Sequence, residues 1–459
     1  MIHRYQKKGL NFVLDVNSGA VHLLDDISYA VSGLLDENMG DTCPQSIIDA
    51  LPDYTADEIR EAYGELYELK KAGQLFAQDD YIDVSRYIPV NAPVKALCLH
   101  VAHDCNLRCK YCFASTGDFG QGRKIMPPEI AKKAIDFVIA RSGVRHNIEV
   151  DFFGGEPLMA WDTVTQTVDY ARSLEEKHNK KFRFTITTNG LLLDEDKRKY
   201  INENMDNCVL SLDGRREVND EFRKTVAGTG SYDTIVPKFK ALVDERDPNL
   251  DYYARGTFTS HNLDFAEDVL SIADAGFDRL SVEPVTADPG CGYDLTEDDL
   301  PKIEAEYDRL TDIMLERKKE GKPFTFFHFM VDLDQGPCVV KRLRGCGAGY
   351  EYVAVTPDGD IYPCHQFVGK DEFKQGSVLD QSFNMDIAQK FAGMNIYSRP
   401  KCQKCWAKFY CSGGCSAANY NMNHDMNDSY DLGCEMERKR LECAIYLKAM
   451  DKICANQSK

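Results

Sequence analysis

Three cysteines at close spacing constrain this chain more than any other feature. Cys105, Cys109 and Cys112 follow a short apolar run typical of a β-strand, so we expect them in a loop at its end. Three thiolates at spacings of four and three can hold three irons of one iron–sulfur cube and leave the fourth iron open. An open iron can bind and activate a chelating small molecule. The alternative is a zinc site, although zinc motifs usually supply four ligands in two pairs.

The composition favours metal ligation over disulfide bonding. The chain has 459 residues and 17 cysteines, most of them closely grouped, and it begins without an apolar segment typical of a signal peptide. No run of 18 apolar residues is present, so we expect no membrane span and a reducing, cytoplasmic setting. The formal net charge of −19 argues against nucleic acid as a partner, because binding phosphates requires clustered Lys and Arg.

Residues 1–90 are predicted to form a small winged-helix-like module. Leu10–Leu14 and Ala20–Leu24 suit two strands of a hairpin, with a turn between them. A capping box at Thr55 begins an amphipathic helix, and residues 74–76 are expected to return as a strand. Strands and helices together in such a short segment favour a separate domain.

Residues 91–290 are predicted to form a partial (β/α)6 TIM-like barrel of the α/β class. Six short apolar runs alternate with amphipathic helical stretches, which indicates a parallel sheet whose chemistry gathers at the carboxyl ends of its strands. The runs are Ala96–Val101, Ile148–Phe153, Phe182–Thr187, Val209–Leu212, Gly256–Phe258 and Leu280–Val285.

Residues 291–459 begin with a charged helix and then become rich in cysteine, glycine and aromatic residues. Regular periodicity fades there, so we expect little core and a contribution of bound metal to folding. Seven of the cysteines in this part form a candidate ligand pattern, at positions Cys346, Cys364, Cys402, Cys405, Cys411, Cys415 and Cys434. The alternative to iron–sulfur clusters is a pair of zinc ribbons that share these seven thiolates.

The first cysteine motif resembles the signature of the radical S-adenosylmethionine (SAM) superfamily. Three segments at the ends of successive predicted strands agree with that family: residues 154–157 (GGEP), 187–190 (TTNG) and 211–214 (SLDG). The resemblance implies that the two glycines admit SAM, that the acidic residue beside them pairs with its ammonium group, and that Arg223 pairs with its carboxylate. The residues it implies for SAM binding are Tyr111, Gly154, Gly155, Glu156, Asn189, Ser211, Asp213 and Arg223, of which Ser211 and Asp213 would lie near the ribose.

The C-terminal cysteines resemble the seven-cysteine SPASM pattern, which binds two auxiliary [4Fe–4S] clusters. The resemblance assigns one set of ligands to each cluster. The first set is Cys346, Cys364 and Cys415, and the second is Cys402, Cys405, Cys411 and Cys434. Cys338 is the candidate for an eighth ligand, on the first auxiliary cluster, and the alternative is that this cluster keeps an open iron.

The order of the parts resembles the peptide-maturing branch of this family. Residues 101–109 and 362–367 look like those of the maturases of six-cysteine peptides, which form thioether links. The resemblance implies an oxidoreductase with SAM and three [4Fe–4S] clusters as cofactors. It acts through a 5′-deoxyadenosyl radical on a Cys-rich precursor peptide, whose leader binds the N-terminal module by strand addition. An external electron donor is also implied.

Several alternatives remain open at the level of sequence. Two keep the radical chemistry: a formylglycine-forming sulfatase maturase and a peptide maturase that forms C–C cross-links. One lies outside catalysis, namely an iron–sulfur or zinc scaffold that only binds a peptide. His365 stands where sulfatase-maturing relatives carry an aspartate base, so it is a candidate base here. His100, His103, Cys98 and Cys208 are expected to pack in the core.

Overall fold

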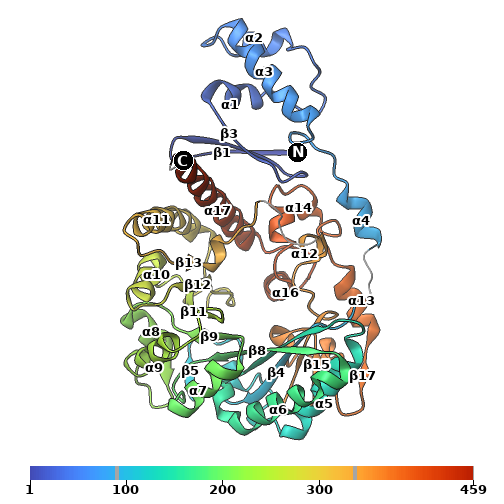
Figure 1. Ribbon diagram of the computed structural model, residues 1–459, viewed down its shortest axis with the longest axis vertical. Helices are drawn as coiled ribbons and strands as arrows, with labels where there is room; N and C mark the ends of the chain where they lie inside the picture. The colour runs from blue at the N-terminus through green and yellow to red at the C-terminus, as the bar shows by residue number, and fades with distance from the viewer. Residues whose placement is uncertain (88–91, 334–338, 458–459) are drawn as a thin grey trace.

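The computed structural model describes residues 1–87, 92–333 and 339–457 of the chain. In Figure 1 the N-terminal module lies at the top and the barrel at the bottom, while several helices of the C-terminal part lie between them. The α-helices are α1 Asp26–Ser32, α2 Gln45–Ala50, α3 Ala56–Lys71, α4 Tyr81–Tyr87, α5 Pro128–Arg141, α6 Trp161–His178, α7 Glu195–Asn204, α8 Arg216–Phe222, α9 Tyr232–Asp244, α10 Phe265–Asp274, α11 Leu300–Lys319, α12 Val339–Arg344, α13 Met385–Gly393, α14 Pro400–Gln403, α15 Lys408–Cys411, α16 Ser416–Asn423 and α17 Asp431–Gln457.

The N-terminal module is an antiparallel sheet with helices on one face. Strands β1 (Ile2–Lys7), β2 (Leu10–Asp15) and β3 (Val21–Leu24) pair in that order, which confirms the predicted hairpin. The capping box at Thr55 is also confirmed, and α3 buries its apolar side against the sheet. Residues 74–76 do not return as a strand: they form a bend after the helix. Strand β1 escaped prediction because charged and polar residues interrupt its apolar positions.

The barrel is a parallel sheet in which strands and helices alternate, as the sequence predicts. All six predicted strands are present, and neighbours in space follow the order β12-β11-β9-β8-β7-β4. They are β4 Ala96–His103, β7 Asn147–Gly154, β8 Lys181–Thr188, β9 Asn207–Ser211, β11 Asp251–Phe258 and β12 Arg279–Pro284. Their outward-facing apolar side chains and those of the covering helices form the main hydrophobic core.

The C-terminal part extends this sheet and has a core of its own. Strand β14 (Tyr352–Val355) pairs in parallel with β4, and β15 (Asp360–Tyr362), β16 (Gly376–Ser377) and β17 (Ser382–Phe383) follow antiparallel. At the other edge β13 (Thr325–Phe326) pairs with β12. The expectation of little core is therefore wrong: Phe367, Phe373 and Phe391 pack together in a buried cluster. Aromatic residues without a regular spacing supply this core, which is why periodicity did not reveal it.

The long helix α17 joins the C-terminal part to the N-terminal module (Figure 1). Ile445 and Tyr446 of α17 pack against Tyr5, Phe12 and Leu14, on the sheet face opposite α1 and α3. The sheet is thus covered on both faces. Among the described residues, no helix combines the length and the hydropathy that a membrane-spanning segment requires.

Candidate SAM and iron–sulfur sites

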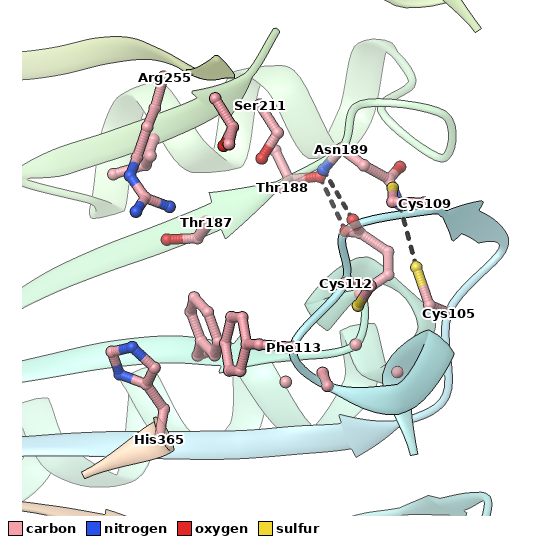
Figure 2. A pocket seen from close by; sticks show the side chains of 18 of the residues that line it. Cys105, Cys109, Cys112, Phe113, Thr187, Thr188, Asn189, Ser211, Arg255 and His365 are labelled. Carbon is pink, nitrogen blue, oxygen red and sulfur yellow. Dashed lines mark hydrogen bonds between the residues drawn. The ribbon is translucent and has the colours of Figure 1, made fainter. Parts of the chain in front are cut away.

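The first cysteine motif is a loop fixed to the barrel by a short two-stranded sheet. Strand β5 (Leu107–Cys109) pairs with β10 (Arg223–Thr225), so Cys109 lies opposite Arg223. Asn189 Nδ2 lies 3.5 Å from Cys105 Sγ, the contact marked by a dashed line in Figure 2. Cys105, Cys109 and Cys112 line one wall of a cavity of about 500 Å³ at the carboxyl ends of the barrel strands. The structure thus brings the three predicted ligands together.

The chemistry of these thiols fits an iron–sulfur cluster. Burial raises the pKa of Cys105 to about 12 and that of Cys109 to about 11, so a thiolate there requires a compensating cation. Iron ions would supply that charge. Within the described ranges, no three His, Cys, Asp or Glu side chains are placed to hold a single metal ion, and the cysteines instead surround a larger space.

The two glycines at the end of β7 allow its backbone to contact the cysteine loop. A Cβ atom on Gly154 would lie 2.2 Å from the carbonyl oxygen of Ala102, and one on Gly155 would lie 2.2 Å from that of Asp104. Gly155 N donates to the Ala102 oxygen at 2.8 Å, so the two chain segments are in direct hydrogen-bonded contact. Any side chain at these positions would push the cysteine loop away.

Glu156 has protein partners for both of its carboxylate oxygens. Oε1 accepts from Leu158 N at 3.0 Å and from Thr188 Oγ1 at 2.8 Å, while Oε2 accepts from Asn189 N at 2.8 Å. Burial raises the pKa of this carboxyl to about 6. In the structure Glu156 therefore ties the end of β7 to the end of β8, and its pairing with the SAM ammonium group stays a prediction.

Tyr111, Asp213 and Arg223 form a buried group next to the cluster loop. Tyr111 donates its hydroxyl hydrogen to Asp213 Oδ2 at 2.5 Å and accepts from Arg223 at 2.8 Å. Arg223 and Ser211 line the cavity, whereas Asp213 stands behind Tyr111 and does not. Asp213 therefore contacts Tyr111 and Arg223 in the structure, and its place near the SAM ribose stays a prediction.

The predicted auxiliary-cluster cysteines separate into two neighbouring cavities. Cys346, Cys364 and Cys415 line one of about 580 Å³, whose wall also includes Cys411 and Cys434. Cys402 and Cys405, with Cys411 and Cys434, surround a second cavity of about 310 Å³. Cys338 lies outside the described residues.

Positive side chains stand beside these cysteines. Arg438 lies 3.9 Å from Cys405 Sγ, and Lys401 and Lys408 line the same cavity. Arg399 is buried and donates to Gly413 O at 2.8 Å. Such cations suit an anionic cluster ligated by thiolates. The sequence analysis did not predict these residues. The basic positions that flank the cysteine motif could have indicated them.

His365 stands where the SAM cavity meets the larger auxiliary cavity. It lines both and packs against Phe113 and Phe153, with ring centroids 5.5 and 5.1 Å away (Figure 2). Its Nδ1 lies 3.3 Å from the Tyr352 hydroxyl. Burial, followed by the charge of Arg255, lowers the pKa of His365 to about 4, so the imidazole is neutral near neutral pH.

The remaining histidines and cysteines behave largely as expected. His100 and His103 are buried and contact each other at 3.2 Å, and Cys98 and Cys208 are buried. Arg255 and Glu283, which line both large cavities, were missed. The sequence feature that could have indicated them is the alternation of polar and apolar residues along β11 and β12.

Comparison with known proteins agrees with these sites. Residues 99–251 match the radical SAM superfamily, and residues 346–406 match the SPASM iron–sulfur cluster-binding domain. The cysteine-type anaerobic sulfatase-maturating enzyme of Clostridium novyi is 25% identical over 354 residues, which are 72% of this chain and 90% of that protein.

Solved structures show the same fold. The structure of anSMEcpe with bound AdoMet is 21% identical, with a TM-score of 0.65 over 80% of this chain and 100% of its own. Streptococcus suis SuiB bound to S-adenosylmethionine is 18% identical, with a TM-score of 0.53 over 94% of this chain and 97% of its own. The cysteine loop, the strand-end motifs and the family matches lead to one conclusion. The protein is a radical SAM enzyme with a C-terminal SPASM domain.

Proposed function

We propose that the protein installs thioether cross-links between cysteines and acceptor residues of a ribosomally made, Cys-rich precursor peptide. The observation that supports this most is the shared wall of the two large cavities. Pro284, Tyr352 and His365 line both the cavity of Cys105 and the cavity of Cys364. A peptide held against this wall has one residue beside the SAM site and another beside the auxiliary cysteines. Closing a C–S bond requires such a pair of neighbouring positions.

The residues have distinct roles in this proposal. Cys105, Cys109 and Cys112 hold the SAM cluster. Cys346, Cys364 and Cys415 hold the first auxiliary cluster, and Cys402, Cys405, Cys411 and Cys434 hold the second. Once bound, SAM and the clusters supply reductive SAM cleavage, hydrogen abstraction and electron removal. The protein positions the peptide and excludes water, with Phe113 and Phe153 as the apolar lining and His365 as a neutral proton acceptor.

The N-terminal module is the proposed site for the leader of the precursor. Strands β1 and β3 each pair only with β2 within the described part of the chain, so both edges of the sheet offer backbone groups to an extended peptide. Streptococcus suis SuiB, whose fold this chain shares over 93% of its length, has been solved bound to precursor peptide SuiA. We propose a division into residues 1–90 for leader binding, 91–290 for the barrel and 291–459 for the auxiliary clusters.

Formylglycine formation on a sulfatase is the second candidate. The similarity to the Clostridium novyi sulfatase-maturating enzyme favours it. The N-terminal module and His365, in place of the aspartate expected from the sulfatase-maturing resemblance, favour the thioether instead. The two activities leave different products, because formylglycine formation removes sulfur from a cysteine and thioether formation retains it.

Mass spectrometry of an anaerobic reaction tests the proposal. The reaction contains reconstituted enzyme, SAM, dithionite and a candidate Cys-rich precursor peptide, followed by reduction and thiol alkylation. We expect two hydrogens lost per link and one cysteine per link protected from alkylation. Loss of two hydrogens with every cysteine still alkylated would indicate a C–C link. Loss of sulfur from a sulfatase peptide would indicate the second candidate. A Cys105→Ala variant should form neither 5′-deoxyadenosine nor product.

A further inference from the structure

The junction of the two large cavities contains an ion pair that the SAM and cluster sites do not use. Arg255 is on β11 and Glu283 is on the adjacent strand β12, and both face the barrel interior. Both also line the cavity that contains Cys364. A peptide that reaches from one cavity to the other must pass them.

One side of the Arg255 guanidinium is engaged and the other is open. Arg255 Nε donates to Glu283 Oε1 at 3.0 Å, and the NH2 group donates to Oε2. The NH1 group has no partner among the described residues, and the side chain remains 43% exposed although its neighbour Ala254 is fully buried. In Figure 2 the guanidinium points into the space between Thr187 and His365. The open nitrogen therefore faces the cavity.

Glu283 is itself held in place from behind. Its Oε1 lies 3.5 Å from Ser281 Oγ and 3.9 Å from His328 Nε2, while His328 Nδ1 lies 3.1 Å from Arg440. Burial acts to raise the pKa of Glu283, but Arg255 and then His328 and Arg440 outweigh it and lower that pKa to about 2. The carboxylate is thus ionised and fixes one orientation of Arg255.

A guanidinium donates only, so its open side requires an oxygen acceptor once the cavity closes over it. We propose that Arg255 binds an oxygen of the substrate peptide, a backbone carbonyl or a side-chain carboxylate, at the junction of the two cavities, with Glu283 as a positioning residue. This inference rests on the proposed peptide modification. The carboxylate of SAM is the competing acceptor, because Arg255 also lines the cavity of the three SAM-cluster cysteines, and a loss confined to SAM affinity would identify it.

The chain offers a matched control on the same pair of strands. Arg279 and Asp251 begin β12 and β11, form an ion pair at 2.7 Å, and lie at the end of the barrel away from the cavity. Arg255→Gln, Arg255→Lys and Glu283→Gln are compared with Arg279→Gln. The double variant Arg255→Gln/Glu283→Gln removes both charges together and leaves neither unpaired, so it separates loss of folding from loss of binding. Thermal unfolding of each protein reports folding.

Two measurements are made on each protein. The first is the dissociation constant of the precursor peptide, with S-adenosylhomocysteine bound in place of SAM, which needs no turnover. The second is the number of 5′-deoxyadenosine molecules formed per modified peptide. Arg255→Gln should weaken peptide binding by about 10- to 100-fold, because a hydrogen bond to a charged group is lost. It should also raise the number of 5′-deoxyadenosine molecules formed per modified peptide. Arg255→Lys should recover part of the affinity, and Glu283→Gln should lose less than Arg255→Gln. The double variant should unfold near the wild-type temperature and still bind peptide weakly.

Replacing the Asp and Glu residues of the peptide one at a time identifies the oxygen that accepts from Arg255. If replacing one Asp or Glu by its amide reproduces the Arg255→Gln effect, the acceptor is that side chain; if none does, it is the peptide backbone. Equal peptide affinities for Arg255→Gln and Arg279→Gln would overturn the inference, as would a loss confined to SAM affinity. A wild-type enzyme that binds the peptide through Arg255 but forms no cross-link would refute the proposed function and keep this inference.

Discussion

The imidazole of His3 stacks on the indole of Trp406, with 3.7 Å between ring centroids and 2° between ring planes. His3 Nε2 also lies 2.9 Å from Glu442 of α17. Trp406 directly follows Cys405, one of the proposed ligands of the second auxiliary cluster. The first strand of the N-terminal module therefore contacts the loop that contains Cys405 directly.

This contact predicts that Trp406→Ala loosens the N-terminal module. An aromatic pair contributes about 0.5–1.5 kcal/mol beyond the area it buries, so hydrogen exchange of the β1 amides should become about 2- to 10-fold faster. Trp161→Ala is the control, because Trp161 packs edge-to-face against Tyr200 at the barrel instead. If the exchange of β1 is equally fast in both variants, the stacking does not hold the module.

Gly155→Ala should distort the SAM site through a clash with the protein backbone. The new Cβ would meet the Asp104 carbonyl oxygen at 2.2 Å, and backbone cannot rotate away as a side chain can. A displacement near 1 Å at a reacting centre can cost about 100-fold in rate, so we expect at least a tenfold loss in 5′-deoxyadenosine formation. Gly64→Ala on α3 meets nothing within 4 Å and should leave the rate unchanged. A Gly155→Ala enzyme with the wild-type rate would contradict this account of the glycine pair.

Much of this architecture follows from the sequence, and the exceptions have physical causes. The barrel strands could be predicted because their apolar residues pack under the covering helices, and the cysteine loop could be predicted because its spacing is a local motif. Arg255 and Glu283 are polar residues on strands, and only the fold shows that they face a cavity and each other. A motif gives the order of its residues but not which side chains line a cavity, so only the fold shows that Ser211 lines the cavity and Asp213 does not.

Asp151 predicts a pH dependence of stability. Burial raises its pKa to about 6, above the value in an unfolded chain, so the folded state binds the proton more tightly. Folding is then favoured while the group is protonated, and that advantage is lost as the pH rises from about 4 to 6. Asp151→Asn should therefore be more stable than wild type by about 1–3 kcal/mol at pH 7 and equal to it near pH 4. Urea unfolding of the apoprotein at both pH values measures this.

The exposed Asp162 at the start of α6 provides the control for that experiment. Asp162→Asn should show no comparable change in the free energy of unfolding between the two pH values. A stability difference between Asp151→Asn and wild type that stays constant with pH would show that burial does not perturb this carboxyl.

Cys364→Ala and Cys405→Ala should each remove a different cluster. The two residues line separate cavities, and Cys405 is absent from the wall that Arg255 and His365 share with Cys364. Each variant should lose about one third of the bound iron if three four-iron clusters are present. Iron analysis and electron paramagnetic resonance check this, with Cys208→Ala, a buried core cysteine, as the control.

Cys364→Ala should also abolish cross-linking while 5′-deoxyadenosine still forms, because only the cavity of Cys364 adjoins the SAM site. Identical signals lost in both variants would mean that the two cavities hold one shared metal centre.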